Sequence, residues 1–73
     1  MLKNESGKDM HPADIKAELE KRGLTLAILG VRNGLAKTTL RNAFDKSYPR
    51  GELIIAKAID KDPKDIWPSR YKD

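Results

Sequence analysis

Residues 37 to 42 combine hydrogen-bonding side chains of several kinds within a short stretch. Lys37 and Arg41 are donors, Asn42 both donates and accepts, and Thr38 carries a hydroxyl and a methyl group. Arg or Lys can donate to the O6 and N7 atoms of guanine, Asn can pair with an adenine edge, and a threonine methyl can touch a thymine methyl. A face that only kept the chain soluble would more often be rich in Glu and Lys. This set of side chains therefore indicates contact with the edges of DNA bases.

These side chains need a helix to present them, and the sequence predicts one over residues 36–45. At about 100° per residue, the apolar side chains share one face: Ala36, Leu40, Ala43 and Phe44. Thr38, Arg41, Asn42 and Asp45 lie opposite, and Lys37 and Thr39 lie on the flanks. A recognition helix presents its N-terminal residues to the major groove. Base contacts are therefore predicted for Lys37, Thr38, Arg41 and Asn42, with Asp45 at the end that leaves the groove.

A shorter helix and a tight turn are expected just before it. Thr25 can cap this helix through its hydroxyl, and Leu26 and Leu29 then share one face. Gly34 can take the left-handed conformation that ends the helix, and Gly30 lets the two helices approach closely. The spacing of Gly30, Gly34 and Leu40 is that of a DNA-binding helix-turn-helix, with the motif spanning residues 25–45.

Two apolar residues of the shorter helix, Ile28 and Val31, lie away from the Leu26/Leu29 face. Either this helix is buried on two sides, or the two residues form an exposed patch that meets a second copy. We expect the first arrangement, because helices at the centre of small domains often pack all round.

The charge of the chain gathers around the same motif. The 73 residues carry a formal charge of +4, and residues 25–51 hold five basic side chains against Asp45 alone, whereas the flanking segments are balanced. This is the footprint of a surface that meets a polyanion. The side chains predicted to contact DNA phosphates are Thr25, Arg32, Thr39, Lys46, Ser47, Tyr48 and Arg50. Tyr48 could equally be a core residue with its hydroxyl at the edge.

The rest of the chain provides the support. Residues 1–10 are expected to form a flexible arm, and residues 11–71 a single domain. A first helix should run from Pro12 to Gly23 behind His11, with an apolar stripe of Ala13, Ile15 and Leu19. Residues 46–51 are predicted as a loop, and residues 52–60 as a buried helix that is apolar nearly all round. Residues 62–67 predict a short last helix that Pro68 ends, Trp67 should close the core, and Tyr71 should pack back from the tail.

Composition excludes several classes of function. The chain has no cysteine and one histidine, so neither a metal site nor a cofactor is expected. The carboxylates are scattered among lysines and no nucleophile has a base partner, so we predict no catalytic residues and no enzyme. No segment has the composition of a signal peptide or a membrane span. A cytoplasmic, nucleoid-associated protein of a bacterial or phage-infected cell is expected.

Five stretches of the chain carry a family resemblance: H-P-A-D-I, K-R-G-L-T-L, T-T-L-R-N-A, P-R-G-E-L-I-I-A and I-W-P-S-R-Y. Through them the sequence resembles the Ner-like regulators of Mu-type transposable phages and their bacterial chromosomal relatives, over residues 10–71. The resemblance implies a compact all-α bundle of about five short helices, arranged as in lambda-repressor-like helix-turn-helix domains. It also implies a repressor that binds operator DNA, with Lys37, Thr38, Thr39, Arg41 and Asn42 at the positions that enter the groove.

Two hypotheses for function follow. The first is a sequence-specific DNA-binding transcriptional regulator of the prophage-repressor type, which occupies a double-stranded operator as a homodimer or as paired monomers on half-sites. The second is an all-α adaptor that kept the fold without specific DNA binding and docks partners through Ile28 and Val31. The steep loss of affinity with salt that marks DNA binding separates them.

Overall fold

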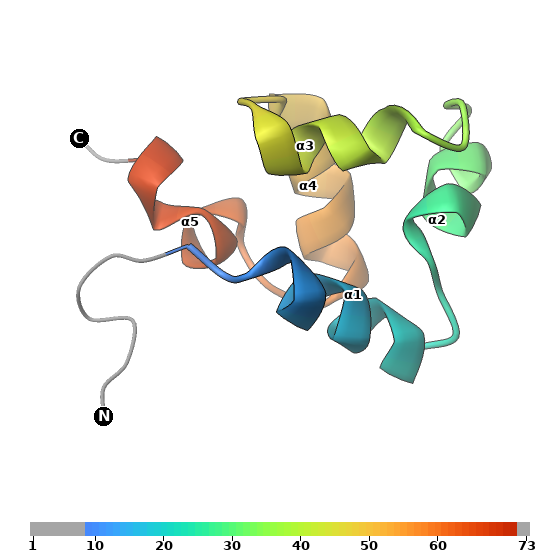
Figure 1. The fold of residues 1–73 in the computed structure, drawn as a ribbon, viewed down its shortest axis with the longest axis horizontal. Helices are drawn as coiled ribbons and strands as arrows, with labels where there is room; N and C mark the ends of the chain where they lie inside the picture. The colour runs from blue at the N-terminus through green and yellow to red at the C-terminus, as the bar shows by residue number, and fades with distance from the viewer. Residues whose placement is uncertain (1–8, 72–73) are drawn as a thin grey trace.

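The computed structural model describes residues 9–71, and every regular element in that range is helical (Figure 1). The all-α prediction is therefore confirmed, with five α-helices and two short 3-10 helices. In chain order they are α1 (Pro12–Lys21), α2 (Leu26–Arg32), η2 (Thr39–Arg41), α3 (Asn42–Asp45), α4 (Pro49–Ala58), α5 (Pro63–Ile66) and η3 (Pro68–Arg70). Residues 1–8 of the predicted arm lie outside the described residues.

Helix α1 begins and ends as its sequence predicts. The Nδ1 atom of His11 accepts a hydrogen bond from the backbone N–H of Ala13 at 3.0 Å, and Pro12 occupies the first helical position. Gly23 follows the last turn with φ of 73°. Ile15 and Leu19 are fully buried, but Ala13 is exposed, so the apolar stripe is narrower than predicted.

Helix α4 lies behind the other helices and contributes to the middle of the core (Figure 1). It begins at Pro49, so the predicted loop over residues 46–51 is wrong: only residues 46–48 link it to α3. Proline is well suited to the first helical turn, which has no use for its missing N–H. The helix is not buried all round as predicted, since the apolar side chain of Leu53 is 50% exposed. The buried core consists of Ile15, Leu19, Leu26, Leu29, Leu40, Ala43, Ile55, Ala56, Ile59, Ile66 and Trp67.

The end of the chain folds back against its beginning. Trp67 is 2% exposed and closes the core, as predicted. Pro68 ends α5 but opens η3 rather than a free tail. The backbone N–H of Met10 donates to the carbonyl of Ile66 at 2.8 Å, and the Asp9 carboxylate accepts hydrogen bonds from the backbone and hydroxyl of Ser69. Asp9 and Met10 are therefore attached to the C-terminal turn.

Candidate nucleic-acid interface

Helix α2 and the turn after it have the predicted geometry. The hydroxyl of Thr25 accepts a hydrogen bond from the backbone N–H of Ile28 at 3.1 Å, which caps the helix. Gly34 has φ of 76°, in the left-handed region that glycine adopts without strain. A Cβ added at Gly30 would lie 3.1 Å from the carbonyl oxygen of Ala36, so the glycine is what allows the chain after the turn to pass so closely.

The second helix of the motif is shorter than predicted. Residues 36–38 form a turn in which the carbonyl of Ala36 accepts from the N–H of Thr39 at 3.1 Å, and helical structure begins only at Thr39. We call residues 39–45, which comprise η2 and α3, the recognition segment. Ala36 is exposed because it precedes this segment, whereas Leu40 and Ala43 are fully buried and Phe44 is half-buried. The apolar face that anchors the segment is therefore present without Ala36.

The side chains predicted to read bases lie on the outer surface of this segment and of the turn before it. Lys37, Thr38, Arg41 and Asn42 are all exposed, and Thr39 is half-buried. Leu40, between them in the sequence, points into the core. The alternation of buried and exposed side chains gives the short segment one polar face that is open to a ligand.

A hollow of about 490 Å³ lies where α1, α2 and the recognition segment meet. Lys37, Thr38 and Arg41 line it together with Thr25, so four of the predicted contact residues are brought together. The complete lining is Lys16, Leu19, Glu20, Leu24, Thr25, Leu26, Ala27, Lys37, Thr38 and Arg41. Three of these side chains are basic and one, Glu20, is acidic, so the hollow is electropositive.

Lys16 is a member of this group that the sequence did not reveal. It lies on the exposed side of α1, in a segment whose charges balance. Only the tertiary fold brings Lys16 of α1 to the same hollow as Lys37 and Arg41. The i, i+4 spacing of Lys16 and Glu20 indicates that the two residues share one helical face, but it does not show which distant segment that face lies against.

The remaining predicted phosphate contacts do not line this hollow. Lys46 and Ser47 are exposed in the link after α3, and Arg32 is exposed in the last turn of α2. Arg50 lies at the first turn of α4, and its guanidinium donates to the carbonyl of Asn33 at 3.5 Å. The charges at the C-terminal end of α2 are thus separate from those that surround its N-terminal end.

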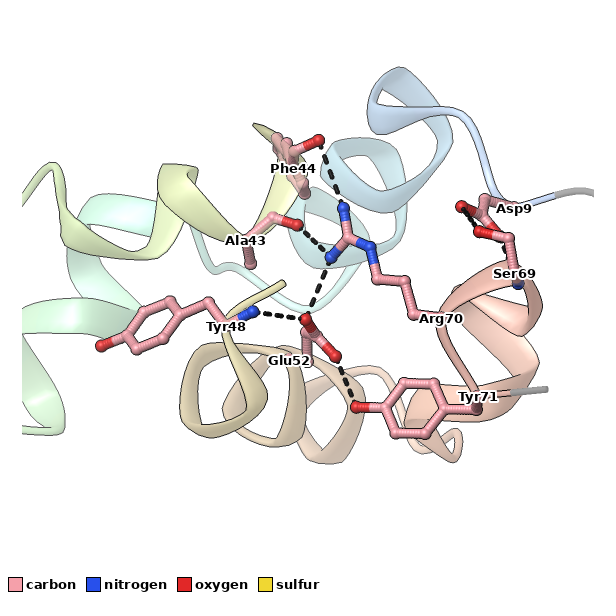
Figure 2. Close-up of polar contacts among 8 residues, drawn as sticks. All are labelled: Asp9, Ala43, Phe44, Tyr48, Glu52, Ser69, Arg70 and Tyr71. Carbon is pink, nitrogen blue, oxygen red and sulfur yellow. Dashed lines mark hydrogen bonds and ion pairs between the residues drawn. The ribbon is translucent and has the colours of Figure 1, made fainter. Parts of the chain in front are cut away.

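The sequence left two roles open for Tyr48, and the structure shows the packing role. Its ring is half-buried against the core, and a Cβ added at Gly51 would lie 2.5 Å from the nearest ring carbon. The ring points away from Glu52, on the side opposite to Tyr71 (Figure 2). Packing therefore accounts for the ring, and the contact of its hydroxyl with phosphate stays a prediction.

The expectation that α2 is buried on two sides is wrong. Ile28 is 41% exposed and Val31 is 56% exposed. Only the face with Leu26, Leu29 and Gly30 packs against the core, because the recognition segment and α4 both lie on that side. The outer face of α2 therefore carries an exposed pair of branched apolar side chains.

A buried carboxylate that the sequence did not single out lies beside the recognition segment (Figure 2). Glu52 is 1% exposed, and its Oε2 atom accepts from the N–H of Tyr48 at 2.7 Å and from the Arg70 guanidinium at 3.0 Å. Its Oε1 atom accepts from the Tyr71 hydroxyl, so Tyr71 packs back as predicted. We call Tyr48, Glu52, Arg70 and Tyr71 the Glu52 cluster.

The Glu52 cluster shifts the pKa values of two of its own side chains. Burial alone would raise the pKa of Glu52, but the bonds donated by Tyr48, Tyr71 and Arg70 outweigh it and hold the pKa below its usual value. The hydrogen bond to the Glu52 carboxylate, with burial, raises the pKa of Tyr71 from 10.0 to about 12. Glu52 is therefore charged and Tyr71 protonated at neutral pH. A lone acid ahead of the apolar run L-I-I-A was the only signal of this arrangement in the sequence.

The described range, residues 9–71, contains neither a cluster of metal ligands nor a membrane-spanning helix. No group of three or more His, Asp or Glu side chains in this range is placed to hold a metal ion. None of the helices in the same range has both the length and the apolar character that crossing a bilayer requires.

A capped helix, a glycine turn and a second helix with one polar face define a helix-turn-helix DNA-binding domain. In agreement, a family model described as "Winged helix-turn-helix DNA-binding" matches residues 9–73. The wing has no counterpart in residues 9–71, because the link over residues 46–48 leads directly to α4 and the range contains no strand.

Individual relatives show to which group within this family the chain is similar. A "Negative regulator of transcription" of Escherichia phage D108 is 55% identical over 71 residues, covering 97% of each chain. The "Sugar fermentation stimulation protein B" of Escherichia coli K12 is 55% identical over 65 residues, covering 89% of this chain and 71% of its own. The solution structure of the Mu Ner protein matches with a TM-score of 0.77 at 49% identity, covering 94% of this chain and 93% of the other. The chain belongs to the Ner group of the helix-turn-helix DNA-binding family.

Proposed function

We propose that this protein is a sequence-specific DNA-binding regulator that represses transcription by occupying an operator. The observation that carries the proposal is the two-sided recognition segment, with Leu40 and Ala43 fully buried and Arg41 and Asn42 exposed between and beside them. A segment anchored in this way can enter the major groove without loosening the core. Two close relatives named as negative regulators of transcription support the repressing role.

We assign the DNA contacts to the hollow and to the exposed surface beyond it. Base edges are read by the exposed side chains at the start of the recognition segment and in its turn: Lys37, Thr38, Arg41 and Asn42. Phosphates are bound by Thr25, Arg32, Thr39, Lys46, Ser47, Tyr48 and Arg50, and we add Lys16 because it lines the same hollow as Thr25. Phosphate contacts position the protein and base contacts give the sequence preference.

The partner is double-stranded DNA, bound by two copies on adjacent half-sites. One recognition segment reads only a few base pairs, and two copies about one helical turn apart double the length that is read. A regulator of this kind acts in the cytoplasm on the nucleoid, and binding alone accounts for its action without an enzymatic step.

The test starts from a random duplex pool, from which the protein selects its preferred sequence. Changing Arg41 to Ala should weaken binding to the selected site by about 5- to 150-fold, the range for one bidentate base contact, with a much smaller loss on random DNA. Equal losses on both would make Arg41 a phosphate contact. A wild-type protein that enriches no sequence would refute the proposed function.

Phosphate contacts give a different signature in the same assay. Lys16→Ala should weaken binding to selected and random duplexes alike and make the salt slope shallower by about 0.9. Lys64→Ala is the matched control, because it removes the same charge from α5, outside the hollow. Arg32→Ala decides whether the C-terminal end of α2 also reaches the DNA backbone.

The exposed pair Ile28 and Val31 favours the adaptor as a second candidate. An adaptor that docks partners through this pair would bind duplex DNA weakly and without sequence preference. The Ile28→Ser, Val31→Ser variant should keep its operator affinity if the protein is a DNA-binding regulator. A lost partner with unchanged DNA binding would instead support docking through this face.

A further inference from the structure

The Glu52 cluster reaches beyond Glu52 to the end of the recognition segment (Figure 2). One guanidinium nitrogen of Arg70 donates to the carbonyl of Ala43 at 2.5 Å as well as to Glu52, and the other donates to the carbonyl of Phe44 at 3.4 Å. Arg70 therefore links the C-terminal turn of the chain to the last turn of α3.

Helix α3 needs an outside partner at this end. It spans only four residues, from Asn42 to Asp45, and a helix this short does not hold itself together in water. The carbonyls of the last turn of a helix accept no hydrogen bond from within the helix, because no helical N–H follows them. The N–H of Lys46 donates a hydrogen bond to the carbonyl of Asn42, and the Arg70 guanidinium donates to the carbonyls of Ala43 and Phe44.

Two side chains hold the guanidinium, and the residue before Arg70 is fixed as well. Its charge pairs with the buried Glu52 carboxylate, and its carbon atom lies 5.3 Å from the centre of the Trp67 ring. The next residue before it, Ser69, is bonded to Asp9. Neither the Glu52 carboxylate nor the Trp67 ring can move without opening the core, so the guanidinium between them is fixed. The carbonyls that it binds are therefore fixed in position as well.

We infer that Arg70 is a positioning residue for DNA reading: through the carbonyls of Ala43 and Phe44 it fixes the angle at which the recognition segment leaves the core. The consequence for DNA rests on the proposed function, whereas the consequence for the segment itself does not. The planar guanidinium spreads its donors over two nitrogens that reach Glu52 and two carbonyls together, whereas a lysine ammonium has its three donors on one nitrogen.

Arg70→Lys tests this inference with the least disturbance. Lysine keeps the charge beside Glu52 but cannot bond the carboxylate and both carbonyls at once. The amide protons of residues 43–46 should exchange about tenfold faster or more, the factor expected for a lost hydrogen bond to a charged group, while those of α1 keep their rates. The preference for the selected duplex over random DNA should fall by a similar factor, with an unchanged salt slope.

Two control variants separate positioning from general stability. Arg22→Lys changes another arginine that pairs with a glutamate and donates to a carbonyl, that of Ile59, but its hydrogen bonds do not involve the recognition segment. Tyr71→Phe removes one bond to Glu52 and leaves the Arg70 contacts with the two carbonyls in place. Neither should speed exchange at residues 43–46 selectively.

Uniform acceleration of exchange across α1, α4 and residues 43–46 in the Arg70→Lys protein would overturn the inference. So would a Tyr71→Phe protein that loosens residues 43–46 as much. If the wild-type protein fails to distinguish selected from random duplexes, the proposed function fails, and the exchange rates still decide the role of Arg70.

Discussion

Leu40 offers a direct test of how the recognition segment is anchored. Its side chain is fully buried between α2 and α4: a Cβ built on Gly30 would lie 3.8 Å from it, and one built on Gly51 would lie 3.3 Å from it. Both neighbours are glycines, so no side chain at either position can move in to fill a space left by Leu40. Leu40→Ala should therefore leave most of its cavity open.

The expected cost follows from that geometry. Leucine-to-alanine changes at sites that cannot collapse cost about 3–5 kcal/mol. A domain of this size has a total free energy of unfolding of about 4–11 kcal/mol, so the change removes a large share of it. The melting temperature should fall by about 12 °C or more, at roughly 4–8 °C for each kcal/mol.

The assay uses the only tryptophan of the chain. Trp67 is buried in the same core, so its fluorescence follows unfolding in urea without a label. Leu53→Ala is the matched control, because it deletes the same atoms from a side chain that is 50% exposed, and it should cost about 1 kcal/mol or less. A Leu40→Ala protein no less stable than Leu53→Ala would refute the view that Leu40 anchors the segment.

Two further predictions concern the turn and the Glu52 cluster. Gly34→Ala should lower the free energy of unfolding by about 1 kcal/mol through its positive φ alone, because a Cβ there meets no atom within 4 Å. Thermal melts should show that Gly34→Asn is the milder change. An alanine variant as stable as wild type would contradict this prediction. The raised pKa of Tyr71 means that its hydroxyl contributes fully below pH 10.0 and loses its contribution as pH rises toward about 12. Urea unfolding across that window should show a steeper loss of stability in wild type than in Tyr71→Phe, and parallel curves would rule out the bond to Glu52.

Local patterns predicted the parts of the fold that depend on neighbouring residues. The Thr25 cap, the left-handed Gly34 and the buried Leu40 all follow from spacing within one helix or turn. The start of α4 at Pro49 was also readable in principle, since proline favours the first helical position as much as a loop. The sequence alone did not show which of these two roles Pro49 takes.

What the sequence could not predict depends on contacts between distant segments. Lys16 joins the hollow only through the packing of α1, and Arg70 reaches α3 across 26 and 27 positions of the chain. Ile28 and Val31 were predicted to be buried because apolar side chains usually are, yet no element covers that face in the described part of the chain. Exposure of a helical face is decided by its neighbours and not by its own composition.

The bonds from Met10 to Ile66 and from Asp9 to Ser69 bring the two ends of the described chain to one end of the molecule, away from the Gly34 turn (Figure 1). A label at Asp9 or Ser69 therefore reports on both ends of the described chain at once, because the two segments can separate only by breaking these bonds.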